Sequence, residues 1–153
     1  MSTHYRGGAA ERRALDVYTR LMRSAKSVGT RLDRRLREQG LTETQFGCLE
    51  MLFHLGPLHP QEITKKHFMT GGNTTFVVTA LEKEGLLRRE PDPNDGRATL
   101  VRLTAKGHRL VEELLPGHVA AIVREFSILS AAEQEELGRL CRMVGTRERP
   151  RAK

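Results

Sequence analysis

Residues 85–107 contain two short extended runs joined by a polar turn, and this stretch limits the folds open to the chain. The turn, residues 91–96, holds two prolines, Asn, Gly and two Asp, the residue types that reverse a chain tightly. The flanking runs, 86–90 and 98–103, are rich in Leu, Val and Arg and predict two strands. Because an isolated hairpin is marginal in water, this ribbon must lean on neighbouring helices.

The rest of the chain follows helical spacing. Its capping signals are the Thr-x-x-Gln and Ser-x-x-Glu boxes that begin at Thr42 and Ser130. The pattern predicts helices over 11–40, from Thr42 to Gly56, over 60–68, over 71–84, after Thr104 with a kink or break at 115–117, and after Ser130. The short helix, the turn and the helix over 71–84 form a helix–turn–helix. We therefore expect a mostly α fold with a small β-ribbon, a winged helix-turn-helix.

Composition narrows the partners of such a fold. The net charge is +7 and the sequence pI is about 10.0, which favours binding to polyanions such as nucleic acid. Aromatic residues make up 5% of the chain and Trp is absent, which disfavours stacking on single strands. Double-stranded DNA is the expected partner because a basic ribbon directly follows the helix–turn–helix pattern. We find no membrane-spanning run and no signal-peptide pattern, and two cysteines make no disulfide framework. We expect a cytoplasmic protein.

The helix over 71–84 opens with small and polar residues, as the leading end of a helix that reads the major groove does. Asn pairs with adenine, Thr reaches bases or phosphates, and glycine lets the backbone approach a phosphate. The alternative is that these residues are ordinary solvated positions on a helix surface. The ribbon that follows directly in the sequence is what favours DNA binding. The predicted DNA-binding residues of this helix are Gly72, Asn73, Thr74, Thr75, Phe76 and Thr79.

The tip of the ribbon places Arg97 beside two carboxylates. Arginine is the side chain that enters a narrow, A·T-rich minor groove, and a carboxylate can hold it in position. Asp95, and also Asp92, would serve in this way without touching DNA. The alternative is an ordinary surface ion pair, worth well under ~1 kcal/mol.

Three segments, LEKEGLLRRE (81–90), DPNDGRA (92–98) and LTAKG (103–107), resemble the winged-helix core of the MarR family of bacterial transcription regulators. Many members carry a basic residue where Phe76 stands, and here the ring would pack or touch a thymine methyl. The resemblance implies a homodimer that places two recognition helices and two wings on a pseudo-palindromic operator and represses transcription. The implied domains are a flexible arm, 1–10, a single MarR-type chain, 11–146, and a basic tail, 147–153. Within the chain, 41–104 is the DNA-binding core, and 11–40 and 105–146 are dimerisation helices, whose apolar length also exceeds what one small domain covers.

The control of such a regulator stays open between three alternatives. A small phenolic or similar aromatic ligand would release the repressor, in a pocket that the resemblance places between the dimer helices and the core. A second alternative is constitutive DNA binding without a ligand, and a third is thiol-based redox sensing through Cys48, for which a buried structural role is the competing explanation. The residues show no catalytic pairing, cofactor motif or metal-ligand spacing, so we expect no enzyme, no cofactor and no metal.

Overall fold

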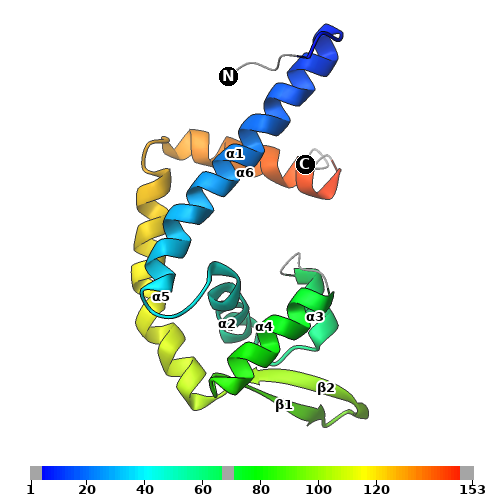
Figure 1. Cartoon of the computed structure of the whole chain (residues 1–153), viewed down its shortest axis with the longest axis vertical. Helices are drawn as coiled ribbons and strands as arrows, with labels where there is room; N and C mark the ends of the chain where they lie inside the picture. Colours follow the sequence, from blue (N-terminus) through cyan, green and yellow to red (C-terminus); the bar gives the residue numbers. More distant parts are fainter. Residues whose placement is uncertain (1–4, 67–70, 149–153) are drawn as a thin grey trace. The chain divides into compact units, whose positions relative to one another are not determined.

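The structure is a computed structural model that describes residues 5–66 and 71–148. Its elements are α1 (Ala9–Arg37), α2 (Glu43–Leu55), α3 (Pro60–Lys66), α4 (Gly71–Lys83), β1 (Leu87–Asp92), β2 (Asp95–Leu103), α5 (Ala105–Phe126) and α6 (Ala131–Thr146). Figure 1 shows the helices and the two-stranded antiparallel ribbon. The predicted fold class is confirmed. The chain divides into two compact units, Met1–Pro116 and Gly117–Lys153, which are described separately.

Helix α1 begins at Ala9, two residues earlier than predicted. Gly8 is its N-cap, and the Glu11 carboxylate accepts the Gly8 N–H at 2.7 Å, which stabilises the first turn. At the other end Gly40, at φ +76°, closes the helix. The Leu41 N–H donates to the Leu36 carbonyl at 3.1 Å and the Gly40 N–H to that of Arg37 at 3.0 Å. This is the glycine C-cap that the sequence predicts.

Asp33 ties α1 to α2. Its carboxylate accepts the Glu43 N–H, the first of α2, at 2.9 Å and also pairs with Arg37. The Glu43 bond first, and the Arg37 bond second, lower the pKa of Asp33 below its ordinary value. The predicted capping box of Thr42 and Gln45 is present at the same end of α2. The start of α2 therefore has two sources of hydrogen-bond partners, one local and one from α1.

The core of the first unit lies between α2, α3, α4 and the ribbon. Each element contributes the apolar positions that helical or strand spacing predicts, among them Ile63 of α3 and Val77, Val78 and Leu81 of α4. The fully buried side chains of largest volume are Phe46, Leu49, Ile63, Leu81, Leu87, Val78, Val101 and Val111. Phe68 and Thr70, predicted as an anchor and an N-cap, lie outside the described residues.

The ribbon is longer than the sequence predicts. Its strands pair from Leu87 opposite Leu103 to Pro91 opposite Thr99, and a register shift follows at Pro91/Asp92. The turn is therefore shorter than the predicted six residues. Pro91 is tolerated within β1 because each strand of a two-stranded ribbon has an unpaired edge. Val101 also exchanges two backbone hydrogen bonds with Leu58, at 2.9 and 3.1 Å, which attaches the ribbon to the loop before α3.

A short hydrogen-bonded joint fixes the ribbon between α4 and α5. The Thr104 hydroxyl donates to the Gly85 carbonyl at 2.7 Å and accepts the Gly107 N–H at 3.1 Å, as the predicted N-cap. Gly107 is buried, and a Cβ there would lie 2.2 Å from the Leu86 carbonyl oxygen. The glycine of the LTAKG segment is thus required by a close approach of two backbones.

The second unit holds the last part of α5 and all of α6. Of the predicted kink or break at residues 115–117, the break is wrong, because α5 continues through Pro116; the boundary between the two units falls at that residue. A missing N–H and local crowding evidently do not end this helix. Ser130 and Glu133 form the second predicted capping box, and α6 contains no buried residue. In the described part of the chain no single helix is long and apolar enough to cross a membrane; only α5 and α6 together, as a bent pair, have that length and composition.

Candidate nucleic-acid interface

The first half of α4 exposes four of the six residues predicted to contact DNA: Gly72, Asn73, Thr75 and Phe76. A Cβ built at Gly72 would meet nothing within 4 Å, so packing within the chain does not explain this glycine. Phe76 is 73% exposed. Thr75 donates its hydroxyl proton to the Gly71 carbonyl at 3.1 Å, one turn back. This half of the helix offers small and polar groups around one large apolar ring.

Thr74 corrects the prediction for this helix. Its side chain is only 1% exposed, and its hydroxyl accepts a hydrogen bond from Thr64 of α3 at 2.9 Å. The Thr64 hydroxyl also lies 2.9 Å from the Pro60 carbonyl. Thr74 shares the inward face with Val77, Val78 and Leu81, because positions three and four apart lie on one side of a helix. It therefore joins the two helices of the helix–turn–helix and does not present its side chain to a ligand.

Thr79 is half-buried and connects α4 to the ribbon. Its hydroxyl accepts a hydrogen bond from the Arg89 guanidinium at 3.1 Å. Arg89 lies in β1, pairs with Glu82 of α4 and also donates its backbone N–H to that carboxylate at 3.1 Å. The sequence does not single out Arg89, because its role depends on the approach of α4 and the next strand across Gly85. The three side chains fix the ribbon relative to the helix.

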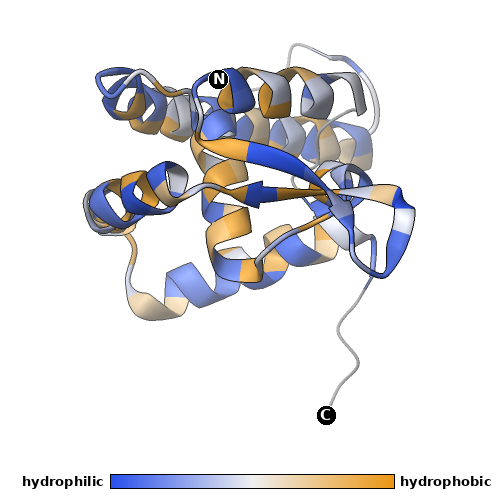
Figure 2. Cartoon of the chain, turned by 90° about the horizontal axis from the view of Figure 1, so that it is seen from below, coloured by the Kyte–Doolittle hydropathy of each residue, from blue (hydrophilic) through white to orange (hydrophobic). Residues whose placement is uncertain are grey.

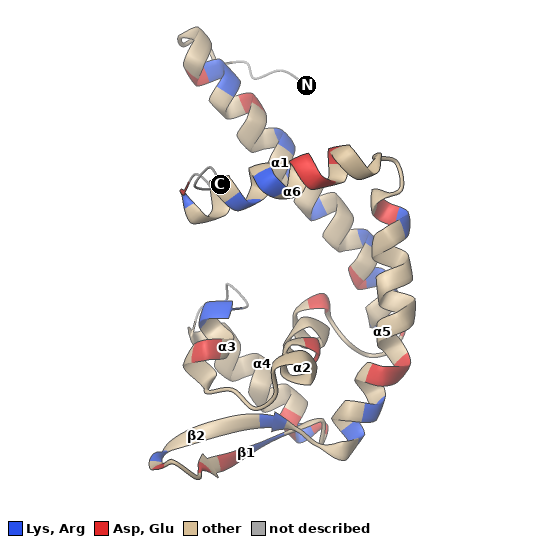
Figure 3. Ribbon diagram, turned by 180° about the vertical axis from the view of Figure 1, so that it is seen from behind, with Lys and Arg blue, Asp and Glu red and all other residues tan. Residues whose placement is uncertain are grey.

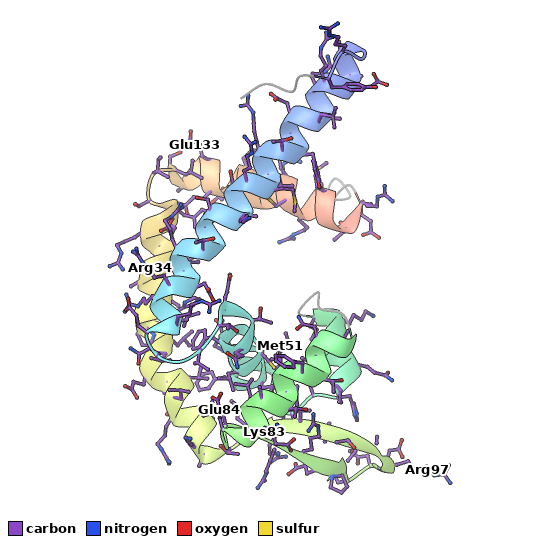
Figure 4. All side chains as sticks on the ribbon, viewed as in Figure 1. Arg34, Met51, Lys83, Glu84, Arg97 and Glu133 are labelled. Carbon is purple, nitrogen blue, oxygen red and sulfur yellow. The ribbon has the colours of Figure 1, made fainter. Side chains whose placement is uncertain are left out.

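Arg97 stands at the outer end of the ribbon and points away from the helices (Figure 4). The guanidinium forms no ion pair with a described residue. Asp95 does lie beside it, but its carboxylate accepts the backbone N–H of Arg97, at 3.1 Å, and not the side chain. Asp95 thus shapes the turn that presents Arg97, which corrects the expectation of a direct side-chain brace. The ribbon tip is coloured blue to nearly white in Figure 2, and so it contains no strongly hydrophobic residue.

Asp92 has a different partner from the one predicted. One carboxylate oxygen accepts the Asn94 N–H at 2.8 Å, and the other lies 3.1 Å from Nε2 of His59. Nδ1 of His59 lies 3.1 Å from the Thr99 carbonyl. Both neighbours are hydrogen-bond acceptors, so a ring nitrogen of His59 that carries a proton can donate to the one it faces. His59, just before α3, thereby fastens the base of the turn. Nothing in the local sequence singles out His59, because its contact with the Thr99 carbonyl spans 40 positions.

Two arginines on the ribbon share one carboxylate. Arg88 and Arg102 face each other across the two strands, and Glu90 pairs with both, at 3.2 and 2.7 Å. Like charges directly opposite would destabilise the pair, and the shared carboxylate offsets this. Figure 3 shows further Lys and Arg along α1 and at the start of α5. The basic excess is thus spread over several elements and is not confined to the candidate interface.

Cys48 was the candidate for regulation by thiol oxidation. Cys48 is fully buried, and burial raises the pKa of its thiol to about 12. Because the thiolate is the reactive form, this argues against redox sensing and for the structural role.

Within residues 5–66 and 71–148, no group of three His, Cys, Asp or Glu could hold a metal ion. A hollow of about 310 Å³ on α1 is lined by Thr30, Arg31, Asp33, Arg34 and Arg37.

Comparisons with known proteins agree with this architecture. The family model described as MarR family matches residues 41–99. The chain is 38% identical to the uncharacterized HTH-type transcriptional regulator YkoM of Bacillus subtilis, over 87% of this chain and 86% of that protein. It is 33% identical to the HTH-type transcriptional regulator MhqR of the same organism, over 87% and 92%. Among solved structures, Sco3205 of Streptomyces coelicolor, a MarR family transcriptional regulator in complex with DNA, has a TM-score of 0.83 at 30% identity, covering 97% of this chain and 94% of that one. These proteins are regulators and not enzymes.

Proposed function

The chain belongs to the MarR family of transcriptional regulators, and from this premise we propose that it represses transcription as a homodimer bound to a pseudo-palindromic operator. The observation that carries the proposal is the joint of α4 and the ribbon. The exposed half of α4 and Arg97 at the ribbon tip belong to elements fixed together by the Arg89 contacts with Glu82 and Thr79. Two DNA-binding elements, α4 and the ribbon tip, that are held rigidly together can bind adjacent grooves of a duplex.

In this arrangement α4 enters the major groove and the ribbon tip enters the neighbouring minor groove. Gly72 allows a phosphate to approach the helix, while Asn73 and Thr75 face base edges or phosphates. Arg97 enters the minor groove, where A·T-rich sequence concentrates negative potential. Thr74 makes no side-chain contact with DNA in this arrangement, because its side chain is buried. The wing then contributes affinity and position, and α4 contributes most of the base selection.

The proposal is tested by selecting duplexes from a random library with the full chain and measuring their affinity by fluorescence anisotropy. We expect the selected sites to be pseudo-palindromic. The dissociation constant should rise steeply with salt, with a slope of roughly 0.9 per neutralised phosphate on logarithmic axes. A flat salt dependence, or selected sites without two-fold symmetry, would contradict operator binding by a dimer.

For control of the repressor we propose release by a small aromatic anion. The supporting observation is the hollow on α1, whose lining contains three arginines, Arg31, Arg34 and Arg37, together with Thr30 and Asp33. Salicylate is a suitable probe, since its carboxylate is a bidentate partner for a guanidinium. It should raise the unfolding temperature and weaken operator binding, and Arg34→Ala should reduce both effects. Unchanged melting and binding at millimolar salicylate and other phenolics would favour the constitutive alternative.

A further inference from the structure

Phe76 is exposed in the first half of α4, where the other exposed residues are small or polar. The ring is 73% exposed, whereas the next two residues, Val77 and Val78, are 4% and 1% exposed. The backbone is therefore rigidly placed by the core, and the ring is held outward. The sequence left open whether the Phe76 ring packs into the protein. Its exposure excludes packing within this chain, because a packed ring would be covered.

The neighbours of Phe76 on the helix surface leave the ring accessible. Positions four before, three after and seven after it share its side of α4. They are Gly72, without a side chain, Thr79, whose hydroxyl is bonded to Arg89, and the exposed Lys83. Figure 4 shows Lys83 at the far end of the helix from its glycines. One aromatic ring thus stands between a bare backbone and a cation on a single helical stripe.

Single exposed apolar residues are common on proteins and need no explanation by themselves. The location is what gives this one a meaning, because the stripe is the face that the proposed function puts into the major groove. That groove presents hydrogen-bond donors and acceptors at every base pair, and its only apolar group is the C5-methyl of thymine. Against any other base edge the ring would desolvate a polar group without giving it a partner.

We propose that Phe76 selects thymine in each half-site of the operator by contact with its methyl group. The inference rests on the proposed function and adds to it one base identity and the side chain that determines it. The contact is apolar, so it should be insensitive to salt, unlike the phosphate contacts of the same complex. It also predicts a thymine within one or two base pairs of the base read by Asn73, since three helical residues span about 4.5 Å.

The test replaces each thymine of the selected operator, one at a time, by deoxyuridine, which removes the methyl and keeps every hydrogen-bonding group. For the wild-type chain, one thymine per half-site should be sensitive. Its replacement should weaken binding about fourfold in one half-site and about fifteenfold in both. For Phe76→Ala, the same replacements should change affinity less than twofold. Because the ring is exposed, this variant should keep the wild-type unfolding temperature, measured alongside.

Arg97→Ala is the matched control. It should lower affinity for the thymine and deoxyuridine duplexes alike, so that their ratio stays at the wild-type value. The inference is overturned if no thymine is sensitive in the wild-type complex, or if Phe76→Ala keeps the wild-type ratio. Both results leave operator binding intact, and so differ from failure of the proposed function, in which the wild-type chain selects no duplex at all.

Discussion

Arg97 is the residue whose removal tests the wing. Its guanidinium points outward and has no ion pair among the described residues, so alanine should leave the fold undisturbed. We expect Arg97→Ala to weaken operator binding about tenfold or more, since a charged hydrogen bond to DNA is lost. Asp95→Ala should weaken it less, because the carboxylate holds only the Arg97 backbone N–H. Fluorescence anisotropy at moderate salt measures both.

Asn at position 95 supplies the control for this pair. Its side-chain carbonyl can accept the same backbone N–H, so Asp95→Asn should bind more tightly than Asp95→Ala. If the three variants all bind like the wild type, the wing does not contact the operator.

Cys48 gives a prediction about reactivity. Its thiol is fully buried and its pKa is raised to about 12, so almost no thiolate exists at neutral pH. In a Cys141→Ser background, Cys48 should react with a thiol reagent only after denaturation, and mild peroxide should leave operator affinity unchanged. Rapid stoichiometric labelling of the folded chain would restore the redox alternative. The exposed Cys141 is removed because its own reaction would obscure the result.

For single residues, the sequence predicts exposure at the loop tip and the helix start better than it predicts which partner each side chain contacts. Arg97, Asn73 and Thr75 are exposed as expected because loop tips and helix starts are polar by composition, whereas the sequence left packing and exposure of Phe76 both open. Thr74 could not be separated from Thr75, since α3, which buries it, is brought there by the tertiary fold. The partners of Asp92 and Arg89 also depend on contacts between separate elements, for which spacing along the chain gives no measure.

Among the elements, the joint between the ribbon and α5 makes the firmest demand on sequence. Alanine usually stabilises a helix relative to glycine by roughly 0.5–1 kcal/mol. At Gly107 it should instead destabilise the fold, by about 1–3 kcal/mol, because its Cβ would lie 2.2 Å from the Leu86 carbonyl oxygen. Urea unfolding at one protein concentration measures the difference.

Gly138 of α6 is the comparison for that experiment. A Cβ there meets nothing within 4 Å, so Gly138→Ala should leave stability unchanged or raise it. If Gly107→Ala were as stable as Gly138→Ala, the close approach of Leu86 would not constrain the joint.

Element types and ends were predictable where local chemistry determines them. Both capping boxes, the Gly40 terminus and the Thr104 N-cap occur where the sequence puts them, because each depends on residues within a few positions. The ribbon turn was predicted too long, since pairing with the opposite strand extends β1 through Pro91. The continuity of α5 at Pro116 was likewise not a local property.

For the whole molecule, the two units differ in how far their apolar side chains are buried within one chain. The first unit encloses every residue of the buried apolar cluster, whereas α6 buries none of its residues. Exposed apolar side chains recur on α1, α5 and α6: Leu15, Val17, Tyr18, Met22, Val119, Val123, Leu137, Leu140 and Val144. The sequence predicts this surplus from its periodicity but cannot say which surfaces meet, because the partner surface is not encoded within one helix.

The surplus leads to a prediction about assembly. Apolar surface on this scale favours association, so sedimentation velocity should find a dimer at micromolar concentration. Leu140→Glu puts a charge on the apolar side of α6 and should shift the chain toward monomer, whereas Glu135→Gln on the same helix should not. The Leu140 variant should also bind the operator at least a hundredfold more weakly, since two half-sites held by one dimer bind with a high effective concentration. Its winged core should still melt cooperatively, because Leu140 is outside the buried apolar cluster. A monomeric wild type, or a monomeric variant with undiminished affinity, would show that operator binding does not depend on pairing of the chains.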